Sequence, residues 1–240
     1  MAKVKASARS VDMLGRQQIA GIQNALSELF KNSHDAYAHR ADVDYFEGAA
    51  ERGDSFIVIR DDGIGMTRDD FEQKWLVLGT DSKAAHNRSK QYRPPEMSER
   101  AVTGEKGIGR LSIALLGKQV VVLTRAKRDD GFHDLVMSYI HWGLFEIPGV
   151  ALDEIDIPIE TFGEGYIPNA NDVAALKEMV LECANRLAQT HEVDVTSIRE
   201  DLAAFAPDPA ELASFFASRD SLPMGLDGEG TGTHFLIGPS

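Results

Sequence analysis

A short apolar run that ends in an acidic glycine turn constrains the fold of this chain most strongly. Residues 55–60 (SFIVIR) are nearly all apolar and rich in β-branched side chains, a pattern typical of a strand covered on both faces. The run leads directly into residues 61–66 (DDGIGM), where two glycines predict a tight turn or a close approach of the backbone to a ligand. Thr67, with Asp70 three residues later, predicts the start of a helix.

The carboxylate of Asp61 stands at the end of this predicted strand, and two interpretations of it are open. Asp-Asp-Gly is an ordinary turn sequence, which would leave the side chain in solvent. A carboxylate at a strand end can also face a pocket and accept a hydrogen bond from an exocyclic amine, such as the N6 amine of adenine.

The run 17–38 is amphipathic, with apolar residues every three or four positions, and predicts one long helix. Glu28, Asn32 and Asp35 follow one another at i, i+4 and i+7, which places two carboxylates and an amide along one side of that helix. An amide oxygen near an acid suits a hard cation such as Mg²⁺, and a carboxylate can orient or deprotonate a water molecule. The alternative is a polar face in contact with solvent.

A polar segment and a glycine-rich turn come next. Residues 81–102 have no apolar periodicity and are locally basic, which predicts a mobile lid over an anionic ligand or else a solvated loop. Residues 103–110 (TGEKGIGR) precede a helical run at 111–116, so their N–H groups and the helix dipole suit a phosphate. Their glycine spacing differs from that of the P-loop and from that of the dinucleotide fingerprint.

The remainder of the chain predicts more strands and then a helical region. The predicted strands are 119–124, its hairpin partner 132–140, 152–159, and a closing strand after the glycine-rich stretch 228–233. The predicted helices are 170–189, 196–205 and 209–218. Residues 41–53 are acidic and contain glycine, and are predicted to be a connection.

Composition narrows the classes of function. The net charge of −13 argues against a nucleic-acid or anionic-membrane surface, so no direct nucleic-acid binding is expected. Cys183 is the only cysteine, which favours a reducing compartment. No apolar run approaches the roughly 20 residues of a membrane span, and the N-terminus lacks the apolar region of a secretory signal. A cytoplasmic location without membrane contact is the expectation.

Four motifs now stand in a specific order. The helix carries E-x-x-x-N-x-x-D-A, the strand end D-x-G-x-G, the turn G-x-x-G-x-G, and the late strand opens with G-T. In this order they resemble the GHKL ATPase superfamily, which includes gyrase B, the ninety-kilodalton heat-shock chaperones, histidine kinases and MutL. The resemblance covers residues 17–237, and the strings at 62–67 and 75–83 are most similar to the chaperone and MORC-like branch.

The resemblance implies the Bergerat fold, an α+β two-layer sandwich whose mixed, mostly antiparallel sheet carries helices on one face. It implies an ATP-binding domain at 16–240, with an ATP lid at about 79–106. The chain begins with small and polar residues, so an N-terminal arm is expected at residues 1–15. Residues 170–221 exceed the family pattern and are expected to form an extra helical insertion.

The resemblance also implies the ligands, ATP and Mg²⁺, and a role for each site residue. Glu28 would be the general base for the attacking water, and Asn32 would ligate Mg²⁺. The residues expected to line the nucleotide pocket and its base are Asp35, Ala36, Asp61, Gly63, Gly65 and Met66. Those expected at the phosphates are Lys83, Gly104, Lys106, Gly107, Ile108 and Gly109. Thr233 would share a water with Asp61, with Thr231 as the alternative because Gly-Thr occurs twice.

Glu28 favours hydrolysis over phosphoryl transfer, because histidine kinases generally lack this glutamate. The expected function is Mg²⁺-dependent ATP hydrolysis by a nucleotide-gated conformational or dimerisation switch. Turnover is expected to be slow, since the lysine of the family's transducer domain is absent. The alternatives are a nucleotide-sensing module with negligible turnover and a histidine-kinase-like phosphoryl donor. Expected partners are ATP and ADP, a second copy in the ATP state, and further domains or proteins.

Overall fold

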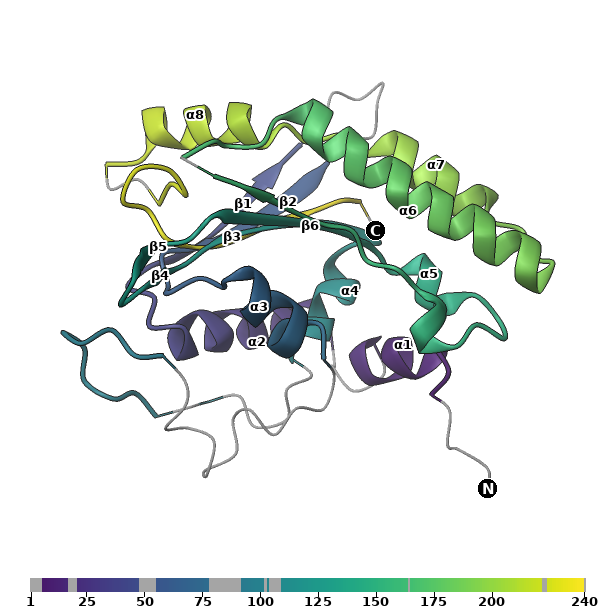
Figure 1. Cartoon of the computed structure of the whole chain (residues 1–240), viewed down its shortest axis with the longest axis horizontal. Coiled ribbons are helices and arrows are strands. Elements are labelled where there is room, and N and C mark those ends of the chain that lie inside the picture. The colour runs from purple at the N-terminus through teal and green to yellow at the C-terminus, as the bar shows by residue number, and fades with distance from the viewer. Residues whose placement is uncertain are drawn as a thin grey trace.

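A six-stranded sheet lies at the centre of the computed structural model, which describes residues 6–16, 21–47, 55–77, 92–101, 103, 109–163, 165–221 and 224–239 (Figure 1). In spatial order its strands are β1 (Ala41–Phe46), β2 (Phe56–Asp61), β8 (Gly232–Ile237), β3 (Gln119–Arg125), β6 (Leu135–His141) and β7 (Ile159–Phe162). Each neighbouring pair in this sheet is antiparallel. A separate two-stranded ribbon joins β4 (Lys127–Arg128) to β5 (Gly131–Phe132).

Helices cover both faces of the sheet, as Figure 1 shows. One face carries α2 (Ile22–Asp35), α3 (Arg68–Asp70), the π-helical turn η1 (Phe71–Trp75), the 3₁₀ turn η4 (Gly109–Ser112) and α4 (Ile113–Leu116). The other face carries α6 (Ala170–His191), α7 (Thr196–Ala204) and α8 (Pro209–Arg219). The remaining elements are α1 (Arg9–Arg16), α5 (Gly143–Glu146) and the 3₁₀ turn η5 (Leu152–Glu154).

Burial on two faces explains the composition of the central strands. Every residue of β3 and β6 is buried, and both strands are rich in Val, Leu and Ile, as expected where helices cover each side. Helix α6 buries Val173, Leu176 and Val180 at a three- to four-residue spacing, which is one apolar stripe against the sheet. The expected helical insertion therefore forms a third layer.

Arg60 ties this third layer to the sheet. Its side chain is 1% exposed, and its Nη2 lies 3.2 Å from Asp44 Oδ2 on β1 and 3.1 Å from Asp220 Oδ2 just after α8. The guanidinium also stacks on Phe216 of α8, with Cζ 3.4 Å from the ring centroid. Removing one partner of such a buried ion pair is costly, because it leaves a charge without compensation.

Most of the predicted elements are confirmed. The strand before the glycine turn, the β3–β6 hairpin pairing, the three late helices and the closing strand are present. Thr67 and Asp70 form the predicted capping box at the start of α3. The helix predicted to reach residue 38 ends at Asp35, because Tyr37 adopts a φ of +61°, a conformation outside the right-handed helix.

Two predicted elements are wrong. The connection predicted at 41–53 begins with β1, whose acidic residues Asp42 and Asp44 point at Arg60 instead of at solvent. The strand predicted at 152–159 is η5 followed by an irregular stretch, and β7 begins only at Ile159. In both stretches, acidic residues alternating with apolar ones were an ambiguous signal.

The described part of the expected N-terminal arm packs against the domain. Ser7 forms a β-bridge with Ala151, and Ala8 N donates to Val150 O at 3.0 Å. Ala8 and Val11 are buried in the core, so residues 6–16 do not form a free arm. Among the helices that the structure describes, none has the length and apolarity needed to cross a bilayer.

Candidate functional site

The carboxylate of Asp61 is buried at the end of β2 and accepts three hydrogen bonds. Ser33 Oγ on α2 donates to Oδ2 at 3.0 Å, and the N–H groups of Gly63 and Thr233 donate to Oδ1 at 3.0 and 3.3 Å. Thr233 is the register partner of Asp61 on the neighbouring strand β8. A helix, a strand end and a second strand therefore hold one carboxylate in a single orientation.

Burial raises the pKa of Asp61 to about 6, although the hydrogen bonds from Gly63, Ser33 and Thr233 oppose this shift. The group is therefore ionised at neutral pH, in a place where water does not stabilise the charge. A strongly shifted and precisely held carboxylate at the edge of a helix layer is a candidate for ligand recognition. As an ionised group it can only accept hydrogen bonds, which suits an amino group.

Thr231 and Thr233 bond different groups near the end of β2, and only Thr233 contacts the carboxylate. Thr231 Oγ1 donates to Gly63 O at 2.9 Å and so holds the glycine loop. The hydroxyl of Thr233 lies 3.0 Å from that of Thr124 on β3, while its N–H faces Asp61. The sequence could not show which of the two Gly-Thr threonines faces Asp61, because only the register between β2 and β8 distinguishes the two positions.

The glycine loop, residues 63–66, is held from several sides. Ile64 N donates to Ala36 O at 2.8 Å, which connects the loop to the end of α2. Met66 N donates to the hydroxyl of Thr124 at 2.9 Å, which connects it to β3. A Cβ atom at Gly63 would lie 2.8 Å from Ala36 O, so a side chain there would push the loop away from the helix.

Gly65 makes the closest backbone contact of this loop, and its replacement by alanine should be strongly destabilising. It has a φ of +59°, and a Cβ atom would lie 1.9 Å from Arg125 O. Gly228 is a matched control, since its φ is +51° and nothing lies within 4 Å of its Cβ position. Both alanine variants bear the left-handed cost of about 1–2 kcal/mol, and only Gly65→Ala adds the overlap. Urea denaturation should show the larger loss for Gly65→Ala; equal losses would contradict the contact.

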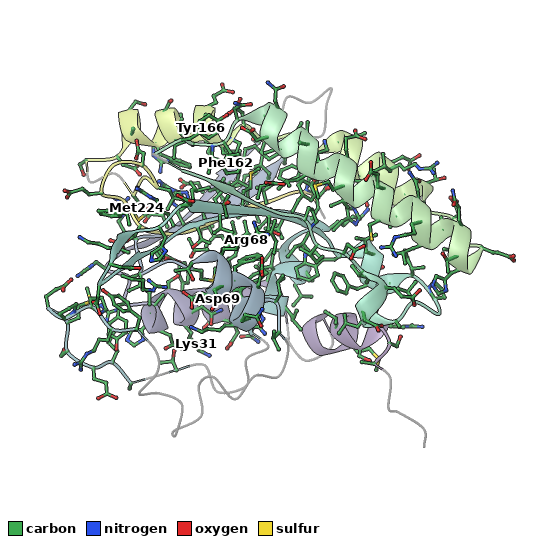
Figure 2. All side chains as sticks on the ribbon, viewed as in Figure 1. Lys31, Arg68, Asp69, Phe162, Tyr166 and Met224 are labelled. Atoms are coloured by element: carbon green, nitrogen blue, oxygen red, sulfur yellow. The ribbon has the colours of Figure 1, made fainter. Side chains whose placement is uncertain are left out.

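Helix α2 brings its acidic flank to the end of the second glycine-rich turn. Glu28 is half-buried, and its Oε1 lies 2.6 Å from Lys31 Nζ. Its other oxygen faces Gly109, where a Cβ atom would lie 2.8 Å from Oε2. Lys31 itself lies on the side of α2 away from the sheet (Figure 2). Ser112 Oγ donates to Ala25 O at 3.2 Å and fixes η4 against α2.

Asp35 has a structural partner that sequence reasoning did not foresee. Its buried carboxylate accepts from the N–H and the hydroxyl of Thr103 at 2.9 and 3.0 Å, both at Oδ1. Arg100 Nη1 donates to Ala38 O at 2.9 Å and to His34 O at 3.2 Å, on either side of Asp35 in the chain. Two contacts thus fasten the segment before the glycine-rich turn to the end of α2.

The predicted site residues can now be placed. Those that the structure describes gather along α2, the end of β2 with its loop, the start of η4 and the start of β8; they are Glu28, Asn32, Asp35, Ala36, Asp61, Gly63, Gly65, Met66, Gly109 and Thr233. The others lie outside the described residues and are Lys83, Gly104, Lys106, Gly107 and Ile108.

Sequence reasoning missed two hydroxyl groups that hold this site, Ser33 and Thr124. Ser33 follows Ala25 and Leu29 at four-residue spacing, so it occupies the buried stripe of α2. A lone serine in an apolar stripe signals a buried polar partner, because a buried hydroxyl needs a hydrogen bond. Thr124, fully buried on β3, gives the same signal directly after the apolar run 120–123.

Comparison with known families identifies the class of protein. The sequence model of the family described as histidine kinase-, DNA gyrase B- and HSP90-like ATPase matches residues 20–156, more than half of the chain. The chain therefore belongs to this ATPase family, which confirms the GHKL resemblance and the α+β fold expected from it. The matched segment contains α2, the glycine loop and η4, and it ends before α6 and β8. Comparison with curated proteins finds no match.

Proposed function

We propose that this protein binds ATP together with Mg²⁺, hydrolyses it, and uses the bound nucleotide to gate a conformational switch. The observation that supports this most is the arrangement around α2. One end of the helix approaches the buried Asp61 through Ser33, and an earlier turn places Glu28 against Gly109. A purine-binding end and a phosphate-binding end are thus separated along one helix.

Asp61 is the group proposed to select the base. Its ionised carboxylate would accept a hydrogen bond from the exocyclic N6 amine of adenine. The N–H groups of Gly63 and Thr233 already occupy Oδ1, which orients the carboxylate before the ligand arrives. Preorganised acceptors of this kind favour a donor and reject a carbonyl oxygen, so guanine, which carries O6 at the same position, is disfavoured.

Asn32 and Glu28 provide the oxygens proposed for the phosphate end. Mg²⁺ prefers oxygen ligands and usually takes one or two from the protein, with the rest from phosphates and waters. An amide at Asn32, half-buried one turn from Glu28, fits that donor set. When bound, Mg²⁺ would neutralise phosphate charge. Gly104, Lys106, Gly107, Ile108 and Gly109, with Lys83, are proposed to hold the phosphates.

Glu28 is the residue proposed to act on water. Its carboxylate lies against the end of the glycine-rich turn, so it is near the place proposed for the terminal phosphate. It would orient the attacking water and accept its proton, and asparagine at position 32 cannot replace it as a base. Asp35, fixed by Thr103, would anchor the chain that leads into the turn.

Removal of the metal is the direct experiment on this proposal. Phosphate release from ATP should exceed background with Mg²⁺ and stop when EDTA is added, while calorimetry should still detect ADP. Release that is unaffected by EDTA would contradict the role of Mg²⁺. An absence of any heat with ADP, at concentrations up to the millimolar range typical of substrates, would contradict the whole proposal.

One observation supports a second candidate, a nucleotide-sensing module with negligible turnover. Lys31 pairs with Glu28 at 2.6 Å, and a carboxylate held in an ion pair is less available to water. This candidate predicts ADP and ATP binding with phosphate release at background. Light scattering with ATP and with ADP distinguishes a dimerisation switch from a monomeric sensor. Only the switch should form a dimer, and so double its molar mass in solution, when ATP is added.

A further inference from the structure

We propose that Arg128 is a positioning residue that fixes the glycine loop and thereby sets the selectivity of the site for adenine. The inference rests on the proposed function, because it concerns the same pocket. Arg128 lies on β4, in the small two-stranded ribbon that continues the β3–β6 hairpin at one end of the main sheet (Figure 1). The ribbon and its Asp129-Asp130 turn have no other assigned role.

The guanidinium of Arg128 binds two consecutive carbonyl groups of the loop. Nη1 donates to Ile64 O at 2.8 Å, and Nη2 donates to Gly65 O at 3.0 Å. The side chain is only 16% exposed, so these bonds form largely out of water. The planar fork of arginine suits two neighbouring acceptors in a way that the single ammonium of lysine does not.

A carboxylate completes the clamp. Arg128 Nη2 also donates to Asp70 Oδ2 at 2.6 Å, and the same oxygen accepts from Thr67 N at 3.2 Å. Burial alone would raise the pKa of Asp70, but hydrogen bonds from Lys74, Arg128 and Thr67 bring it down to about 2, so the group is charged throughout the neutral range. Arg128 therefore joins the glycine loop to the capped start of α3.

The contacts of Arg128 can affect the Asp61 carboxylate through Gly63, which connects the two. Gly63 N donates to Asp61, and the next two carbonyl groups along the chain are those that Arg128 holds. Without Arg128, Ile64 O and Gly65 O lose these donors, and buried carbonyl groups without a donor are costly. The loop would then move toward water and take the Gly63 N–H away from Asp61. The carboxylate would lose the orientation that distinguishes an amino group from a carbonyl.

The experiment compares Arg128→Met and Arg128→Lys with Lys127→Met. Lys127 is a matched control on the same ribbon, exposed and 4.8 Å from the ring centroid of Phe132. Hydrogen exchange of residues 63–67 is measured in the ligand-free protein, followed by the dissociation constants of ADP and GDP. Arg128→Met should raise the hydrogen-exchange rate of the loop. It should also raise the dissociation constant of ADP about tenfold, while that of GDP changes less than twofold. Arg128→Lys should fall between, and Lys127→Met should match the wild type.

Kinetics separate positioning from a purely structural role. With ATP as substrate, Arg128→Met should raise KM and leave kcat within about twofold, since the clamp acts at the base and not at the phosphates. An unchanged ADP-to-GDP ratio, or unchanged loop exchange in both Arg128 variants, overturns the inference. Suppose that the wild type binds no adenine nucleotide while hydrogen exchange of the loop still rises in Arg128→Met. That result would contradict the proposed function but would support the contact between Arg128 and the loop. Should Arg128→Met not fold, Arg128→Lys alone decides between these outcomes.

Discussion

Replacing Glu28 by alanine should lower ATP turnover by roughly a hundredfold or more while ATP and ADP still bind, because a lost general base costs about that much. The carboxylate lies against Gly109 and pairs with Lys31, and the side chain is 30% exposed. The measurements are steady-state phosphate release and calorimetric titration with ADP.

The control for this variant is Glu72→Ala. Glu72 lies on the same side of the sheet and pairs with Arg68 at 2.7 Å, as Glu28 pairs with Lys31. It is not one of the predicted site residues. Surface ion pairs contribute little to stability, so both alanine variants should unfold at nearly the same urea concentration. Equal turnover in Glu28→Ala and the wild type would exclude Glu28 as the base and would favour the sensing module.

Replacing Asp61 by asparagine should have two opposite effects, a more stable protein at pH 8 and at least tenfold weaker ADP binding. Burial raises the pKa of Asp61 from its usual 3.8 to about 6, so the folded protein binds this proton more tightly than the unfolded chain does. The wild type gains stability from this group at low pH and loses it as pH rises through 6. Asparagine cannot ionise and does not suffer this loss.

The size and shape of the effect follow from the pKa. Between pH 5 and pH 8 the stability of Asp61→Asn relative to wild type should increase by about 1.4 kcal/mol, which corresponds to one pH unit below the folded pKa. Urea denaturation at several pH values measures this difference. The change should occur below pH 7 and level off above it.

Binding provides the second half of this test. The ratio of wild-type to Asp61→Asn affinity for ADP should rise as pH passes through 6, because the ionised carboxylate is a stronger acceptor for the adenine amine than the protonated carboxyl or the asparagine amide. Taking the ratio cancels the titration of ADP itself. A variant that binds ADP as tightly as wild type at pH 8 would remove Asp61 from the base pocket, whatever its effect on stability.

The parts of the fold that sequence predicted correctly are those encoded locally. The strand before the glycine loop, the Thr67–Asp70 capping box and the stripe of α6 each depend on residues a few positions apart. The strand β1 was missed because its aspartates read as a solvated connection. Their partner Arg60 lies 16 to 18 residues away in the chain, and no local pattern reveals it.

The candidate site divides in the same way. Glu28, Asn32 and Asp61 stand in recognisable motifs, so they could be named in advance. The groups that orient them could not, because Ser33 and Asp61 are 28 residues apart and Arg128 reaches a loop 63 to 64 residues away. Those contacts exist only once the strands have paired, and they are the ones that decide how a motif residue is held.

The adjacent residues Arg60 and Asp61 give the end of β2 two attachments. Successive side chains of a strand point to opposite faces, so Asp61 turns toward α2 while Arg60 turns toward Phe216 and Asp220 at the end of α8. The two groups share one rigid peptide plane. The strand end that presents Asp61 is therefore also the anchor of α8, so the candidate pocket and the helical layer share one attachment on β2.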